Sequence, residues 1–204
     1  MNKRTLLFQG DEITTANYNN MSEENGYVHL IEEKMSGYNV LNMAEDGIDT
    51  FVMYSRWDER GMDYLPDVFT IMIGKNDISE AAKLPCGETA RRYTVLIDAA
   101  IREARRIKPD IQLIFIEPFI VVGDEMTENE KLMKSEMTKL QNELESMVKK
   151  YECGYIKTQE YFDLNRGAVS DKFFPDASGQ KFIADMWLKC FADAESGRER
   201  KPRP

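Results

Sequence analysis

The chain has 204 residues, of which 42% are hydrophobic and 31% charged, and its formal net charge is −9. A chain of this length and composition suits one globular domain with a sizeable core. The acidic balance disfavours nucleic acid and membranes as partners, because there is no basic surplus to neutralise phosphates. No apolar stretch reaches the roughly 18 residues of a membrane span.

Three cysteines are too few and too scattered for a disulfide framework or a zinc site. They are Cys86, Cys153 and Cys190. We therefore expect reduced thiols and a cytoplasmic protein. The basic, proline-containing end of the chain predicts a disordered tail over residues 195–204, after a single domain over residues 1–194.

The first predicted strand lies near the start of the chain. Leu6, Leu7 and Phe8 form an apolar run that Gly10 breaks before two acidic residues. This pattern is typical of a buried strand that ends in a sharp turn. In open α/β sheets, ligands bind at the carboxyl ends of the strands, so we expect a site at this turn.

The rest of the chain alternates helix and strand patterns. Apolar residues at helical spacing predict helices over 23–35, 49–57, 87–107, 127–151 and 178–191. Short apolar runs predict further strands over 38–42, 66–73, 111–116 and 154–157. Thr127 and Glu130 have the spacing of a capping box. Five strands separated by helices predict a parallel sheet in a three-layer αβα, flavodoxin-like domain.

Four motif blocks follow one another along this pattern. They read G-D-E-I-T at 10–14, N-M-A-E-D-G-I-D-T at 42–50, P-D-V-F-T-I-M-I-G-K-N-D-I at 66–78 and D-K-F-F-P-D-A-S-G at 171–179. In order and spacing they resemble the blocks of the SGNH/GDSL esterase and lipase superfamily. That resemblance implies the SGNH hydrolase fold, the same five-stranded αβα architecture that the patterns predict.

The resemblance also implies site residues, with two departures. Gly47 and Asn76 match the two oxyanion donors, and Asp171 matches the aspartate that orients the catalytic histidine. Glu12 stands where the family has its serine nucleophile, and Phe174 stands where it has the histidine. Phenylalanine cannot transfer a proton, and a carboxylate is a weak acyl nucleophile. Standard serine esterase chemistry is therefore excluded by residue identity.

Four other residues are candidates to replace the missing serine and histidine. The only histidine, His29, lies in a predicted helix and is expected to have a structural role. Thr14 and Thr15 follow the turn but have no base, and Ser178 is a candidate helix N-cap. None of them restores a triad.

The sequence leaves three functions open. The first is a catalytically impaired pseudo-esterase, in which the Glu12 carboxylate accepts hydrogen bonds from the Gly47 N–H and the Asn76 amide. Such a protein would bind a small ligand, such as a carbohydrate or an ester, or a partner in the old cleft. No cofactor is expected, and the oligomeric state is left open. Lys75 is a further candidate to neutralise Glu12, although successive residues at a strand end tend to point to opposite faces.

The other two functions use the acids differently. In one, Glu12 and Asp171 act as an acid and base pair in a hydrolase of acetylated carbohydrates or of glycosides. In the other, Glu12, Asp171 and Asn76 supply hard oxygen ligands to Mg²⁺ or Ca²⁺. The acids Asp11 and Asp77 are expected to be structural.

Overall fold

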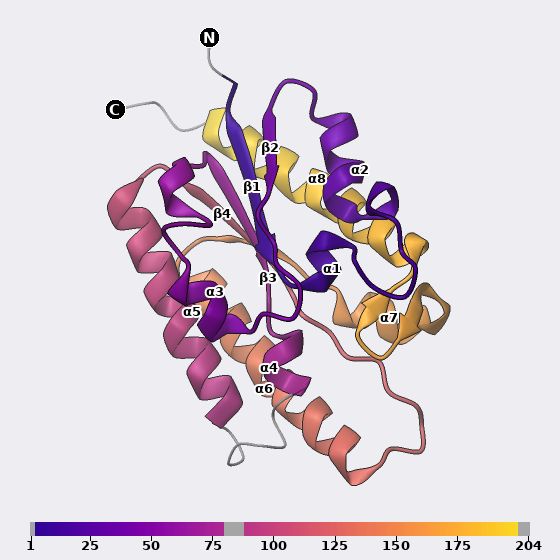
Figure 1. Cartoon of the computed structure of the whole chain (residues 1–204). Helices are drawn as coiled ribbons and strands as arrows, with labels where there is room; N and C mark the ends of the chain where they lie inside the picture. The colour runs from indigo at the N-terminus through magenta and orange to yellow at the C-terminus, as the bar shows by residue number, and fades with distance from the viewer. Residues whose placement is uncertain (1–2, 80–87, 200–204) are drawn as a thin grey trace.

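The computed structural model describes residues 3–79 and 88–199. Its central feature is a five-stranded, fully parallel sheet with the order β2-β1-β3-β4-β5 (Figure 1). The strands are β1 (Thr5–Gly10), β2 (Asn39–Asn42), β3 (Val68–Met72), β4 (Gln112–Ile116) and β5 (Gly154–Ile156). This is the flavodoxin-like order, so the predicted fold class is confirmed.

Helices cover both faces of the sheet (Figure 1). They are α1 (Glu12–Thr15), α2 (Tyr27–Lys34), α3 (Thr50–Ser55), α4 (Lys75–Ser79), α5 (Glu88–Ile107), α6 (Glu128–Lys150), α7 (Gln159–Leu164) and α8 (Ala177–Glu199). Three 3₁₀ turns, η1 (Glu23–Asn25), η2 (Met62–Tyr64) and η4 (Arg166–Ala168), and a hairpin of β6 (Val169–Asp171) and β7 (Phe174–Pro175) complete the described elements.

The core is divided between the two faces because strand side chains alternate. On β1, Leu7 packs into the cluster formed with α3, α5 and α6, and Leu6 and Phe8 pack into the cluster formed with α2 and α8. Strand β3 is buried along its whole length, as expected for a central parallel strand covered on both sides. The sheet therefore holds the carboxyl ends of β1 and β3 in fixed positions.

Some predicted boundaries change. The helix expected over 23–35 is split at Gly26 into η1 and α2, because the backbone of that glycine is extended. The capping box is confirmed, with the Thr127 hydroxyl accepting from Glu130 N and Glu130 accepting from the Thr127 backbone. The Asp176 carboxylate, not Ser178, accepts from Gly179 N in the first turn of α8.

The end of the chain also differs from expectation. Helix α8 continues to Glu199, so that residues 195–199 lie in a helix where the sequence predicted the start of the tail. The rest of the expected tail and Cys86 lie outside the described residues. Within the described part of the chain, no helix is long and apolar enough to cross a membrane.

Candidate functional site

The site begins where β1 gives way to α1. Gly10 is the last residue of β1, and a Cβ there would lie 2.3 Å from the carbonyl oxygen of Met72 and 2.2 Å from Thr14 Oγ1. Only glycine allows this close approach of β1 to β3 and α1. Asp11 then caps α1, accepting from Ile13 N at 3.0 Å. Glu12 follows as the first residue of α1, at the carboxyl end of β1.

The Glu12 carboxylate lies among three donors. Its Oε2 accepts from Gly47 N at 3.0 Å and from Asn76 Nδ2 at 3.0 Å. Its Oε1 accepts from the Lys75 ammonium in an ion pair. Burial raises the pKa of Glu12, but the hydrogen bonds from Lys75 and Asn76 outweigh burial, so that its pKa lies below the usual value. The two family-matched donors and Glu12 are therefore brought together as the sequence predicted.

Lys75 and Asn76 both reach Glu12, contrary to the expectation that they point to opposite faces. The reason is that residues 75–79 form α4 instead of continuing β3. Gly74 makes this change of direction with a positive φ of 130°. The Asn76 amide is held in turn by the carbonyl of Ile48, at 2.9 Å.

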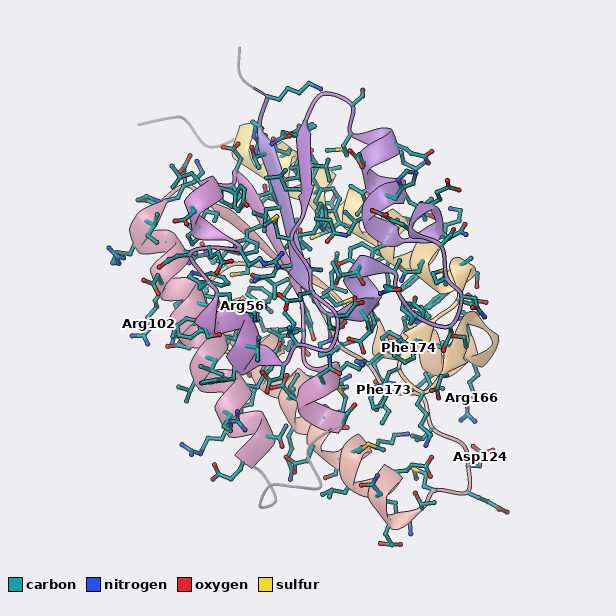
Figure 2. All side chains as sticks on the ribbon, viewed as in Figure 1. Arg56, Arg102, Asp124, Arg166, Phe173 and Phe174 are labelled. Carbon is teal, nitrogen blue, oxygen red and sulfur yellow. The ribbon has the colours of Figure 1, made fainter. Side chains whose placement is uncertain are left out.

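Phe174 lies beside the same lysine. The Lys75 ammonium nitrogen is 4.7 Å from the centroid of the Phe174 ring, and that ring stacks on Tyr18 with centroids 4.6 Å apart. Figure 2 labels Phe174 next to Phe173 in the loop that carries β7. The structure therefore connects the two substituted positions, Glu12 and Phe174, through Lys75.

Asp171 is placed differently from the other four site residues. It is exposed at the end of β6, and its Oδ1 accepts from the backbone N–H of Lys172 at 2.5 Å. Within the described residues no hydrogen bond joins it to Glu12, whose two oxygens already have donors. This arrangement adds no support for an acid and base pair of Glu12 and Asp171.

Two further acids brace the turns, as expected. Asp77 Oδ2 accepts from both the backbone N–H and the hydroxyl of Thr50, at 3.0 and 2.9 Å. Burial raises the pKa of Asp77 to about 6, against the lowering effect of the Thr50 hydrogen bonds. Burial and the neighbouring Glu12 charge raise the pKa of Asp11 to about 7, although Lys75 and Ile13 N–H lower it. Both carboxyls have few water contacts, so the charged form is disfavoured.

Glu45 and Asp46, two acids of the motif block at 42–50, hold the loop that carries Gly47. Glu45 pairs with Arg56, labelled at the end of α3 in Figure 2, and with Arg60 at 3.2 Å. Asp46 accepts from Thr15 Oγ1 at 2.5 Å. The loop is thus tied both to α3 and to the end of α1. The sequence alone assigned neither of these two acids a role in holding the loop.

The donor set does not favour a divalent metal. Among residues 3–79 and 88–199 no group of three or more His, Cys, Asp or Glu side chains lies close enough to hold a metal ion. A cation at Glu12 would also have to displace the Lys75 ammonium from Oε1. The only histidine, His29, lies on α2, 3.8 Å from Glu33.

Comparisons with known proteins agree with the fold and the motif blocks. The chain is 24% identical to the acetylxylan esterase of Geobacillus stearothermophilus over 205 residues, which covers 90% of this chain and 92% of that protein. The crystal structure of Axe2, an acetylxylan esterase from the same organism, matches with a TM-score of 0.76 at 21% identity, covering 93% and 94% of the two chains. A putative GDSL-like lipase from Parabacteroides merdae matches with a TM-score of 0.77 at 20% identity, covering 93% and 95%. Residues 8–182 match the GDSL-like Lipase/Acylhydrolase family, and the chain belongs to this family.

Proposed function

We propose that this protein is a catalytically impaired member of its family that has kept the old active-site cleft for binding. One observation carries the proposal. The Glu12 carboxylate accepts hydrogen bonds from Gly47 N and Asn76 Nδ2, both at 3.0 Å. These are the positions that match the family's oxyanion donors, so a side chain of the protein itself occupies the place of a reacting oxygen.

The remaining chemistry is weak for two reasons. An ester carbonyl would have to displace a carboxylate that makes charge-assisted hydrogen bonds. Nothing at position 174 can accept the proton of a nucleophile, because Phe174 presents an aromatic ring to Lys75. Loss of triad members costs on the order of 10⁴ to 10⁶ in rate.

The proposed ligand is a small molecule such as a carbohydrate or an ester, or a partner that enters the same cleft. Support for a carbohydrate comes from the relatives described as acetylxylan esterases. A cytoplasmic location is part of the proposal, and the free thiols of Cys153 and Cys190 are consistent with it.

Hydrolysis of p-nitrophenyl acetate tests the impairment. We expect turnover close to the uncatalysed rate for the unchanged protein and for Glu12→Ala alike. The matched control is Glu24→Ala, which removes an exposed acid away from the site. Fast turnover that disappears in Glu12→Ala but persists in Glu24→Ala would overturn the proposal, because it would make Glu12 a working catalytic group.

A further inference from the structure

The group that surrounds Glu12 offers more than the two family-matched donors. Lys75 adds an ammonium to the Gly47 N–H and the Asn76 amide, and all three contact one carboxylate. Only 5% of the surface of Lys75 is exposed. A buried ammonium needs an anion beside it. Here Glu12 is that anion.

We infer that Gly47, Lys75 and Asn76 form a receptor for a carboxylate group, which a small organic acid occupies when the Glu12 side chain withdraws. This receptor is called the carboxylate cradle below. The inference rests on the proposed function, since it names the ligand class of the same cleft. Glu12 is then a tethered copy of the ligand's acid group.

The geometry selects a carboxylate over a neutral carbonyl. Two donors converge on one oxygen and the ammonium takes the other, so that both oxygens of a carboxylate are satisfied. An ester or an amide has one carbonyl oxygen to offer and no charge, and it would leave the Lys75 ammonium buried without a counterion. The Phe174 ring, 4.7 Å from the ammonium, keeps Lys75 in place when the carboxylate is exchanged.

Glu12 competes with any such ligand from within the chain. A tethered group acts at an effective concentration of millimolar or more. The unchanged protein should therefore bind free carboxylates more weakly than a protein without the Glu12 acid group. A ligand with further contacts in the cleft would overcome this competition.

The test is the binding of acetate to Glu12→Ala. Thermal melting and calorimetry both measure this binding. Sodium acetate at about 100 mM should raise the Tm of Glu12→Ala by about 4 °C, and the Tm of the unchanged protein by much less. Acetamide at the same concentration and sodium chloride at the same ionic strength are the controls. Neither should reproduce the shift. The double variant Glu12→Ala/Lys75→Met should lose it.

Each outcome of the acetate test either supports or overturns the carboxylate cradle. Equal shifts with acetate and acetamide, an unchanged response in the double variant, or no acetate response would each overturn the carboxylate cradle. If Glu12→Ala folds only when acetate is present, as followed by circular dichroism, the inference is supported. If it fails to fold even with acetate, the inference is overturned. Failure of acetate binding leaves the hydrolysis test of the proposed function untouched, since that test measures turnover.

Discussion

Glu12 and Lys75 form an ion pair that is almost closed to water, with 15% and 6% of their side chains exposed. Neither charge has much solvent to stabilise it, so each depends on the other and on the neighbouring donors. The motif resemblance matches Glu12 to the family's serine, and the pair with Lys75 ties the start of α1 to the start of α4. Glu12 therefore makes a structural link between these two elements.

Removing one partner of the ion pair should lower the free energy of unfolding by a large amount. Lys75→Met leaves the Glu12 carboxylate partly buried without its ammonium, and we expect a loss of about 3 kcal/mol in the free energy of unfolding at pH 7. Urea unfolding measures it. The matched control is Lys131→Met, which removes a lysine paired with Glu128 on the exposed side of α6. Its cost should stay within about 0.5 kcal/mol.

A double-mutant cycle isolates the pair. Glu12→Gln/Lys75→Met removes both charges, and its stability should return to within about 1 kcal/mol of the unchanged protein. Strictly additive losses in the two single variants would contradict the coupling that the contact implies.

The proposed impairment predicts that a serine at position 12 together with a histidine at position 174 gives hydrolysis. We expect Glu12→Ser/Phe174→His to hydrolyse p-nitrophenyl acetate at least about 10²-fold faster than the unchanged protein, because a serine gains a histidine base beside retained oxyanion donors. Each single variant should stay inactive, since a nucleophile without a base, or a base without a nucleophile, does little.

A third change tells whether this gain uses the old machinery. Adding Asn76→Ala removes one oxyanion donor and should lower the gained rate by about 10²-fold. A double variant that folds but stays inactive would contradict this prediction. It would show that changes beyond positions 12 and 174 prevent hydrolysis, and that the exposed Asp171 does not orient a histidine at position 174.

Much of this site could be predicted from the sequence, because it depends on strand ends. Five apolar runs separated by helical patterns suffice for the sheet, and the carboxyl ends of β1 and β3 are neighbours in that sheet. The meeting of Glu12 with Gly47 and Asn76 follows from the family blocks, and the hydrogen bonds are observed.

Lys75 was a candidate partner of Glu12 from the sequence, but its direction could not be predicted, since that direction depends on a helix of five residues. Strand alternation places it away from Asn76, and only the turn at Gly74 and the start of α4 bring both to Glu12. Short elements such as α1, α4 and the β6-β7 hairpin carry too few residues for a periodic pattern. The helical residues 195–199 were missed for a different reason, because charged composition hides a helix that continues from a packed segment.

Asp11 predicts an unusual pH dependence. Burial raises its pKa from 3.8 to about 7. Between these two pH values the native state therefore holds a proton on Asp11 that the unfolded chain has released. Its contribution to stability is complete below pH 3.8 and is lost as the pH rises through 7. Asp11→Asn keeps a side-chain oxygen for Ile13 N but removes the titration. The variant should therefore be the more stable protein at pH 8, with a flatter profile between pH 4 and 7 in urea unfolding.

The pKa of Glu12 is shifted in the opposite direction to that of Asp11, so its effect on the pH dependence of stability is also opposite. Its lowered pKa means that its contribution is present above the ordinary value of 4.5 and is lost as the pH falls below it. Glu12→Gln should therefore change the profile on the acid side only. If Asp11→Asn is instead less stable than the unchanged protein at pH 8, the ionised carboxylate stabilises the native state and the raised pKa of Asp11 is wrong.

Asp77 anchors the first turn of α3 through a single oxygen. Asp77 Oδ2 accepts from both the N–H and the hydroxyl of Thr50, and Thr50 lies three residues after Gly47. Asp77→Ala leaves these donors unpaired, and we expect a loss of about 2 kcal/mol in unfolding free energy. Asp77→Asn still offers a carbonyl oxygen and should lose less than about 1 kcal/mol. Because Asp77→Ala removes one of the contacts that hold the Gly47 loop, the acetate response of Glu12→Ala should weaken when that change is added. An undiminished response would show that the Gly47 loop is held without Asp77.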